Sequence, residues 1–488
     1  MARHPVILEV FAWPWLAALS AEAGRAITLA EVPHEAWDAL ALPQPTAVWL
    51  MGVWERSPAA REIALTDPSF AATTAAVLPD AAAADVVGSP YAIRSYEVDE
   101  RLGGRDGLAA AREALAERGS TLVLDFVPNH VAPDHAWVAA HPEFFVHGTR
   151  EDLEADPAAW LETRQGILAR GRDPFFPAWP DVLQLDPMSP GLREAVVETL
   201  SDIASQCDGV RCDMAMLVLD DVAERTWGER LAPRRPEPYW REVTTEVARA
   251  YPEFLFIAEA YWDREAELFE QGFDLCYDKR LYDRLAGGDA AGLRAHLRAD
   301  PAWQSQLVRF LENHDEPRAA AVFGLDRHLA AAVSLLTLPG AVLLHEGQTE
   351  GLRTRLPVHL GRRPAEPADA AVSALWNRLL SPVPLHGVRS GEWALLEVDG
   401  DPSLLAWRWH EHLVAVNVSP ATAAGWVHVG EQFAGNAWRL VDLLDDTVFL
   451  RDGDELAAHG LYVALPPHGA HVFRLEGRRD ARTAYKMV

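Results

Sequence analysis

Residues 207–215 read Cys207-Asp208-Gly209-Val210-Arg211-Cys212-Asp213-Met214-Ala215, which predicts a short buried strand ending on a charged pair. Arg211 and Asp213 are two residues apart, and side chains alternate along a strand, so both point to the same face. A neighbouring guanidinium keeps a carboxylate ionised and fixes its orientation. A carboxylate nucleophile requires these conditions. Because Arg-x-Asp on a strand is more often a structural ion pair, its function depends on its surroundings.

Polar residues also follow other apolar runs of the chain. They are Asn129 and His130 after residues 121–127, Glu259 at the end of residues 253–259, and His314 and Asp315 after residues 307–312. A purely structural strand end does not need such groups, because burying an unpaired charge is costly. We therefore expect these residues to converge on one site.

The apolar runs alternate with helical patterns along most of the chain. Eight predicted strands, most of them followed by a helix, suit burial on both faces and favour a (β/α)8 TIM barrel with its catalytic groups at the strands' C-terminal ends. The alternative is a doubly wound open sheet, but no Gly-x-Gly-x-x-Gly follows the first strand. Residues 59–88 are rich in Ala and Asp and are predicted to be irregular.

Two segments depart from this alternation. Residues 131–188 carry many aromatic residues and prolines without a clear period, which predicts a short inserted loop domain of functional importance after the third strand. From about Val388, short alternating segments are separated by Gly, Pro, Asp and Asn, which predicts an antiparallel β-sandwich. The expected domains are a catalytic barrel over 1–385, the sandwich over 386–476 and a tail over 477–488.

Composition excludes several classes of partner. The formal net charge of −28 repels phosphate backbones, so nucleic acid is not an expected partner, whereas a neutral substrate is indifferent to it. There is neither an apolar run of about 18 uncharged residues nor a signal-peptide pattern, so we expect no membrane segment. The three cysteines suit a reducing compartment and lack metal-ligand spacing. These features predict a cytoplasmic protein, and its oligomeric state stays open.

Four ordered motifs resemble the signatures of glycoside hydrolase family 13, the alpha-amylase family. They are Asp125-Phe126-Val127-Pro128-Asn129-His130, Gly209-Val210-Arg211-Cys212-Asp213, Phe256-Ile257-Ala258-Glu259 and Glu312-Asn313-His314-Asp315. All four stand in the order of that family at plausible spacing. The resemblance extends over the other barrel strands and the closing β-domain, and hence over most of the chain.

The resemblance implies a role for each motif residue. Asp213 corresponds to the nucleophile, Glu259 to the general acid/base, and Asp315 to the third carboxylate, which binds sugar hydroxyls. The implied substrate-binding residues are Tyr91, His130, Arg211, His314 and Arg318. Among these, Arg211 holds the nucleophile, the tyrosine ring packs against the sugar and the histidines hydrogen-bond it. Asp125 is expected to be structural.

The chemistry calls for the same residue types. A retaining glycosidase requires two carboxyl groups about 5–5.5 Å apart, one ionised and one protonated. Arg211 keeps Asp213 charged, while Glu259 lies on an apolar strand close to other carboxylates and should hold its proton more tightly. Trp54, Trp179, Tyr261 and Trp262 are candidate partners for flat sugar faces, although Trp179 and Trp262 suit core packing equally well.

Two positions depart from the family pattern. Met216-Leu217 stands where many amylases carry Lys-His, so the leaving-group side of the cleft is expected to be apolar or differently shaped. Many amylases bind calcium through the signature asparagine and an aspartate of the long loop. Asn129 is present, but Gln184 occupies the matching loop position, and a hard cation prefers carboxylates. We therefore expect no cofactor and no obligatory calcium.

The expected function is that of a retaining hydrolase that cleaves α-1,4-glucosidic bonds of malto-oligosaccharides or starch fragments by double displacement. The alternative is an alpha-glucan transglycosylase or a disaccharide isomerase of the glucanotransferase or trehalose-synthase type, because the same intermediate serves both. A non-catalytic sugar-binding barrel is disfavoured, because all three acidic residues are present. Linkage preference, chain-length preference and endo or exo action stay open.

Overall fold

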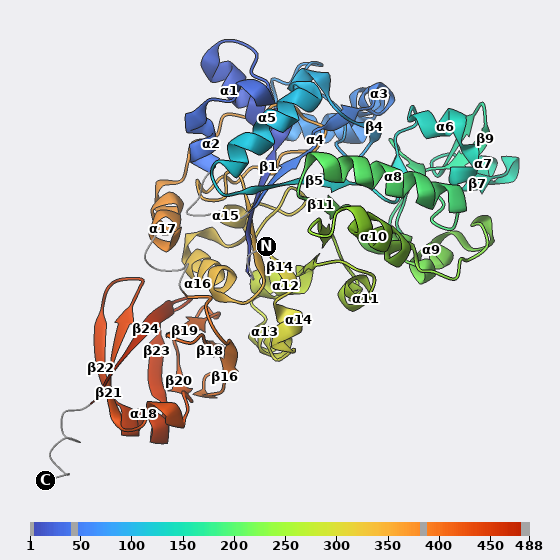
Figure 1. Cartoon of the computed structure of the whole chain (residues 1–488). Helices are drawn as coiled ribbons and strands as arrows, with labels where there is room; N and C mark the ends of the chain where they lie inside the picture. Colours follow the sequence, from blue (N-terminus) through green and yellow to red (C-terminus); the bar gives the residue numbers. More distant parts are fainter. Residues whose placement is uncertain (1–3, 41–46, 381–387, 480–488) are drawn as a thin grey trace, which may run out of the picture. The chain divides into compact units, whose positions relative to one another are not determined.

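The computed structural model describes residues 4–40, 47–380 and 388–479. Eight parallel strands form a closed barrel in the order β1-β15-β14-β13-β12-β11-β5-β2, which confirms the predicted fold class (Figure 1). They are β1 (Val6–Phe11), β2 (Ala47–Met51), β5 (Thr121–Phe126), β11 (Gly209–Cys212), β12 (Leu255–Ala258), β13 (Leu275–Tyr277), β14 (Leu307–Arg309) and β15 (Ala341–His345).

The chain divides into two compact units, one of residues 7–277 and 355–365, the other of residues 1–6, 278–354 and 366–488. In the first unit, α8 and α10 lie side by side (Figure 1). The helices of this unit outside the 131–188 insertion are α1 (Ala12–Ala23), α2 (His34–Leu40), α3 (Pro58–Thr66), α4 (Pro68–Val77), α5 (Gly104–Ala116), α8 (Pro190–Gln206), α9 (Asp220–Trp227), α10 (Tyr239–Ala250) and α11 (Glu265–Glu270).

The register of the barrel strands decides which side chains are neighbours. Strand β11 pairs in parallel with β5, and Arg211 lies opposite Asp125. On its other side β11 pairs with β12, and Cys212 lies opposite Ala258. Every residue of these strands is buried except Thr121 at the start of β5, as expected for a sheet covered on both faces. The residues that directly follow β11 and β12 therefore emerge side by side.

The segment predicted to be irregular, residues 59–88, contains most of α3 and all of α4, so that prediction was wrong. Both helices begin with a capping residue followed by proline. Ser57 accepts a hydrogen bond from Ala60 N, and Asp67 accepts one from Ser69 N. Proline at the first helical position costs no hydrogen bond, which explains why an alanine-rich segment becomes helical here.

The insertion after β5 contains small sheets of its own. Strands β7 (His147–Gly148), β9 (Gly166–Ala169) and β8 (Trp160–Thr163) form one sheet, and β6 (His130–Val131) pairs with β10 (Leu183–Gln184). The helices α6 (Ala136–Ala140) and α7 (Arg150–Ala155) also belong to the insertion. Val146 and Trp160 of the insertion form a small apolar cluster with Trp227 of α9. Outside the insertion, β3 (Trp54–Arg56) pairs with β4 (Ile93–Val98).

The second unit joins two barrel strands to the C-terminal sheets. Its helices are α12 (Lys279–Gly287), α13 (Ala290–Leu297), α14 (Pro301–Gln304), α15 (Ala319–Val322), α16 (Gly324–Thr337), α17 (Ala370–Leu380) and α18 (Gly453–His459). One sheet has the order β16-β18-β19-β24-β21-β22 and the other the order β17-β20-β23. Their strands are β16 (Ala394–Leu396), β17 (Val398–Gly400), β18 (Leu404–Arg408), β19 (His412–Asn417), β20 (Ala423–Val427), β21 (Asn436–Asp442), β22 (Val448–Asp452), β23 (Leu461–Leu465) and β24 (Ala470–Arg479).

Both C-terminal sheets contribute to one apolar core. Leu413 and Phe473 come from the larger sheet, and Val427 and Val463 come from the smaller one. This core fits the predicted β-sandwich. The predicted boundary near residue 385 lies outside the described residues. Strand β24 continues to Arg479, and the rest of the predicted tail lies outside them as well.

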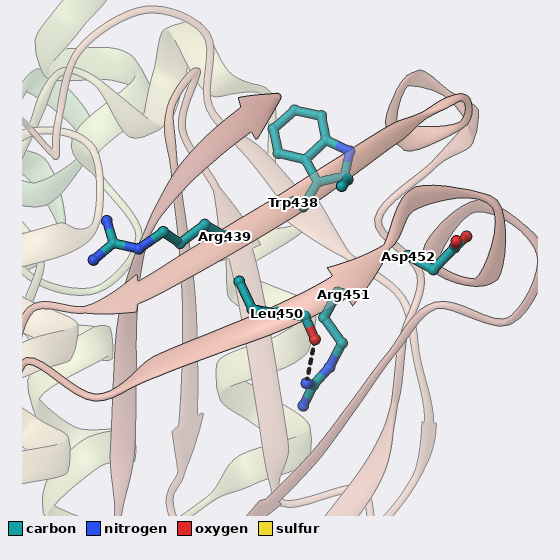
Figure 2. A pocket seen from close by; sticks show the side chains of 6 residues that line it. Trp438, Arg439, Leu450, Arg451 and Asp452 are labelled. Carbon is teal, nitrogen blue, oxygen red and sulfur yellow. Dashed lines mark hydrogen bonds between the residues drawn. The ribbon is translucent and has the colours of Figure 1, made fainter. Parts of the chain in front are cut away.

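An open pocket lies on the β21–β22 hairpin of the sandwich (Figure 2). Its volume is about 300 Å³, and it is lined by Ala437, Trp438, Arg439, Leu450, Arg451 and Asp452. Asp452 is the only carboxylate in this lining, and its side chain caps α18 by accepting hydrogen bonds from two backbone N–H groups. The pocket therefore lacks the pair of carboxyl groups that glycoside hydrolysis requires.

Among the described residues, no helix combines the length and the apolar composition needed to cross a membrane.

Candidate active site

One guanidinium joins the two principal carboxylates. Arg211 Nη1 donates to Asp213 Oδ1 at 2.8 Å, and Arg211 Nη2 lies 2.8 Å from Glu259 Oε2. The side chains of Arg211 and Glu259 are 1% and 3% exposed, and that of Asp213 is 9% exposed. Nη1 and Nη2 belong to the same planar guanidinium, so the two carboxylates that they contact must lie close to each other. The structure therefore brings the predicted nucleophile and acid/base close together.

The backbone explains why these two carboxylates meet. Asp213 and Glu259 are the first residues after β11 and β12, which are parallel neighbours. Asp213 N donates to Phe126 O at 2.8 Å, and Glu259 N donates to Cys212 O at 3.0 Å. The ladder thus continues one residue beyond the strands and holds both residues in place.

Three aromatic rings surround the guanidinium. Arg211 Cζ lies 5.1 Å from the ring centroid of Trp49, 5.3 Å from that of Tyr91 and 5.7 Å from that of Tyr277. Such contacts stabilise a cation that has lost its water. Burial by itself lowers the pKa of Arg211, but the neighbouring Glu259, the tyrosines and Asp213 raise it well above its ordinary value. Arg211 therefore stays charged.

Another carboxylate, that of Asp125, lies beside the cluster. Asp125 Oδ1 is 3.8 Å from Arg211 Nη1, and Asp125 Oδ2 accepts a hydrogen bond from Gly52 N at 3.1 Å. Trp54 Nε1 donates to the backbone oxygen of Asp125 at 2.7 Å. These contacts tie β5 to the end of β2 and suit the structural role expected for Asp125.

Glu259 receives two further hydrogen bonds. Met214 N donates to Glu259 Oε2 at 2.6 Å, and the Tyr261 hydroxyl donates to Oε1 at 2.8 Å. Burial favours the neutral acid, whereas Arg211 and both of these donors favour the carboxylate. The environment of Glu259 therefore supports both forms that a general acid/base must adopt.

The backbone adopts left-handed conformations beside both carboxylates. Met214 has φ 42°, and this conformation turns its N–H toward Glu259. Trp262 and Asp263 have φ 59° and 61°. None of these residues is glycine, and such conformations cost about 1–3 kcal/mol each. Strain of this kind concentrates at functional sites, and here it accompanies the hydrogen bonds from Met214 N and the Tyr261 hydroxyl to Glu259.

His130 lies buried on the segment that follows β5. Its Nδ1 accepts a hydrogen bond from Asn129 Nδ2 at 3.2 Å, which places the ring proton on Nε2. Burial lowers the pKa of His130 to about 3, so the ring is neutral at pH 7. The ring centroids of His130 and Trp179 are 5.1 Å apart. Tyr91 is half-buried and packs over Arg211, as described above.

The remaining predicted residues belong to the other compact unit. His314 Nε2 lies 2.9 Å from Asp315 Oδ2, and the Asp315 side chain is 45% exposed. Arg318 is buried, donates to Glu312 Oε1 at 2.5 Å and to Glu346 O at 2.9 Å. Asp315 and His314 thus form a pair just after β14, while Arg318 is engaged by protein acceptors of its own unit.

The sequence did not predict Trp49, Tyr277 or the Met214 N–H as parts of this constellation. Tyr261 was predicted as a partner for a sugar face, and its hydrogen bond to Glu259 was not predicted. Tyr277 ends β13, so the rule that polar residues at strand ends form the site could have identified it. Trp49 lies inside β2, and no pattern in the sequence indicates that it contacts an arginine. The Met214 contact depends on a backbone angle, which residue type does not predict.

No family model matches the chain. The chain is 29% identical over 267 residues to "Alpha-amylase MalA" of Haloarcula japonica, a match that covers 53% of this chain and 36% of that protein. It is 22% identical over 297 residues to "Alpha-amylase 3" of Dictyoglomus thermophilum, covering 56% of each. In sequence the chain is thus similar to proteins named alpha-amylase.

A third relative carries a transferase name. It is the "Alpha-1,4-glucan:maltose-1-phosphate maltosyltransferase" of Pseudomonas aeruginosa, 26% identical over 179 residues, which cover 36% of this chain and 23% of that protein. In each of these three comparisons, the chain thus spans well under two thirds of the relative's length.

Solved structures share the alpha-amylase fold. A noncanonic maltogenic alpha-amylase, AmyB of Thermotoga neapolitana, superposes with a TM-score of 0.68 at 18% identity, covering 97% of this chain and 100% of that chain. An alpha-amylase of Geobacillus thermoleovorans complexed with acarbose superposes with a TM-score of 0.66 at 18% identity, covering 97% and 98%. At these identities the likeness concerns the fold.

The calcium site implied by the alpha-amylase resemblance does not fit the residues present. Asn129 Oδ1 accepts a hydrogen bond from Gln184 Nε2 at 2.8 Å, and Asn129 Nδ2 donates to Gln184 Oε1 at 3.3 Å. The asparagine oxygen is thus engaged, and no carboxylate stands at Gln184. Within residues 4–40, 47–380 and 388–479, no cluster of three His, Cys, Asp or Glu residues could hold a metal ion. The amide pair links Asn129, which follows β5, to Gln184 of strand β10 in the insertion.

Proposed function

We propose that this protein is a retaining glycoside hydrolase that cleaves α-1,4-glucosidic bonds of malto-oligosaccharides or starch fragments. The observation that supports this most directly is the bridging of Asp213 and Glu259 by Arg211. Close carboxyl groups suit direct displacement, whereas an inverting enzyme needs room for a water between them. The substrate is a neutral oligosaccharide, which the protein's strong negative charge does not repel.

In the first step, the Asp213 carboxylate attacks the anomeric carbon of the substrate. Glu259 gives its proton to the glycosidic oxygen, the bond between that oxygen and the anomeric carbon breaks, and a glycosyl-enzyme ester forms on Asp213. In the second step, Glu259 takes a proton from water, whose oxygen attacks the anomeric carbon and releases Asp213. Arg211 stabilises whichever carboxylate is charged at each stage.

We propose Asp315 as the third carboxylate and Tyr91, His130 and His314 as sugar contacts, as the motifs predict. The neutral ring of His130, with its proton on Nε2, suits a donor to a sugar hydroxyl. Arg318 as a contact of a neighbouring subsite stays a prediction, and its hydrogen bonds to Glu312 and Glu346 mean that substrate has to compete for it.

Glycosyl transfer is the second candidate function. The transferase name of one relative supports it, as do Met216 and Leu217, which are buried and offer no polar group at the positions that the sequence associates with the leaving-group side. Transfer uses the same glycosyl-enzyme, with a sugar hydroxyl replacing water in the second step.

Incubation with maltopentaose separates these candidates. Shorter products alone, such as glucose and maltose, indicate hydrolysis, whereas a ladder of longer products indicates transfer. Asp213→Asn and Glu259→Gln should each abolish product formation. Glu253→Gln, which changes an exposed glutamate before the same strand, is the matched control and should retain full activity. Unchanged sugar processing in both active-site variants would show that the carboxylates are wrongly assigned.

We also propose that activity and stability require no calcium. The Asn129–Gln184 amide pair supports this, because its hydrogen bonds link the segment after β5 to the insertion without a metal ion. Chelation with EDTA should leave the thermal unfolding midpoint and the activity unchanged. A lower midpoint that added calcium restores would contradict this proposal.

A cytoplasmic location is likewise proposed. Its support is the set of free, buried cysteines, Cys207, Cys212 and Cys276, which suits a reducing compartment. Cell fractionation tests it, and recovery of the protein outside the cytoplasm would contradict it.

A further inference from the structure

The two oxygens of Glu259 have different kinds of hydrogen-bond partner. Oε2 faces two nitrogens, Arg211 Nη2 at 2.8 Å and Met214 N at 2.6 Å. Oε1 accepts from the Tyr261 hydroxyl at 2.8 Å. A guanidinium and a backbone N–H only donate, whereas a hydroxyl can also accept. When Glu259 is protonated, its proton therefore belongs on Oε1, the oxygen next to Tyr261.

The backbone around Tyr261 fixes the position of its hydroxyl. Arg264 N donates to Tyr261 O at 3.3 Å, which closes a turn whose two central residues, Trp262 and Asp263, both have positive φ. Without glycine at either position, this turn is maintained at the cost of strain. Arg264 pairs with Asp221 of α9 and anchors the end of the turn. The turn thus holds Tyr261 two residues beyond Glu259.

The Trp262 ring offers a second anchor. It packs edge-on against Phe175 of the insertion, with ring centroids 4.9 Å apart. Tyr261 itself is half-buried. The contacts of Trp262 and Arg264 therefore hold the turn in place and keep the Tyr261 hydroxyl against Oε1.

We propose that Tyr261 is a positioning residue that sets the proton affinity of Glu259 through the hydrogen bond to Oε1. This rests on the proposed role of Glu259 as the acid/base. The hydroxyl can bond to both forms of Glu259, but the bond that it donates to the charged carboxylate is stronger than the one that it accepts from the neutral acid, so Tyr261 makes Glu259 a stronger acid and speeds proton donation to the leaving sugar. Tyr261 takes no part in bond making.

Other charged and titratable groups also face Glu259. Arg211 contacts it directly, Asp213 shares that guanidinium, and Tyr277 of β13 interacts with it electrostatically. Asp125 Oδ1 lies 3.8 Å from Arg211 Nη1, the other terminal nitrogen of the guanidinium. All of these remain in Tyr261→Phe, which removes one hydroxyl and keeps the ring. A change in the pH profile of that variant thus reports the hydroxyl alone.

The test is the pH dependence of kcat/KM for Tyr261→Phe. Without the hydroxyl, Glu259 keeps its proton to higher pH, so the alkaline limb should move up by roughly 0.5–1 pH unit, which corresponds to one hydrogen bond. At the optimum, kcat/KM on maltopentaose should fall by about threefold to tenfold. On 4-nitrophenyl maltoside, whose leaving group hardly needs a proton, kcat/KM should change less than about twofold.

Tyr462→Phe is the matched control, because Tyr462 is an exposed tyrosine of β23 in the sandwich, and it should leave the profile unchanged. An unmoved alkaline limb in Tyr261→Phe, or an equal loss on both substrates at every pH, would overturn the inference. A second measurement adds Tyr261→Phe to Glu259→Gln and should cause no further change in the residual rate. If Glu259→Gln by itself stays fully active, the acid/base assignment fails instead.

Discussion

Two buried arginines on barrel strands have opposite surroundings. Arg211 of β11 faces the carboxylates of Asp213, Glu259 and Asp125. Arg309 of β14 faces one carboxylate, Asp278 at 3.2 Å, and its other acceptors are the neutral oxygens of Pro339 and Gln304. Both side chains are 1% exposed. Burial of an arginine by itself therefore says nothing about function.

The balance of charge separates the two clusters. Burial lowers the pKa of Arg309, and Asp278 only partly compensates, whereas the carboxylates around Arg211 raise its pKa well above the ordinary value. Burial raises the pKa of Asp278, but its bonds to His296 and Arg309 hold it below the usual range. The Arg309 cluster is thus a balanced structural pair. Around Arg211, three carboxylates face one guanidinium, and such an excess of carboxyl groups suits the proposed acid/base and nucleophile roles.

The largest expected effect comes from Arg211→Met. Without the guanidinium, Asp213 and Glu259 repel each other and one of them takes up a proton, so the proposed nucleophile, Asp213, is no longer reliably charged. We expect kcat on maltopentaose to fall by about 10³-fold, the upper range for loss of one electrostatic stabiliser. Steady-state kinetics on the purified variant measure this, and less than a tenfold loss would show that Arg211 is structural.

Arg309→Met should have the converse phenotype. It leaves Asp278 buried without its guanidinium, so we expect the free energy of unfolding to fall by about 3 kcal/mol. For molecules that remain folded, kcat should stay within about twofold, because the ion-pair partner of Arg309 is Asp278 of its own unit and not Asp213 or Glu259. Denaturant unfolding and kinetics on the same sample distinguish the two effects. A large loss of kcat without loss of stability would contradict the comparison.

Expressed as a free energy, the effect of Asp125→Asn should be the smallest of the three. The amide oxygen can still accept the hydrogen bond from Gly52 N, while the charge 3.8 Å from Arg211 is lost. We expect activity to fall by less than about tenfold, because the closer carboxylates keep Arg211 oriented. The readout is kcat/KM beside that of Asp213→Asn, and similar losses in the two variants would assign Asp125 a direct role in the chemistry.

The sequence predicted the barrel and the Arg211–Asp213–Glu259 set because strand periodicity and motif order depend on residue type. It did not predict α3 and α4, although Ser57-Pro58 and Asp67-Pro68 are recognisable helix starts. The contacts of Met214 and Tyr261 with Glu259 could not be predicted from the sequence. They depend on left-handed backbone angles at Met214, Trp262 and Asp263, which are residue types that rarely adopt them.

The central claim is that Asp213, held by Arg211, forms the covalent bond to the sugar. Incubation of Glu259→Gln with a 5-fluoro maltosyl fluoride should trap the glycosyl-enzyme, because fluoride departs without protonation while the second step lacks its base. Peptide mass spectrometry should then find the sugar on Asp213. A sugar on any other residue, or turnover of the reagent without a trapped ester, would contradict the account.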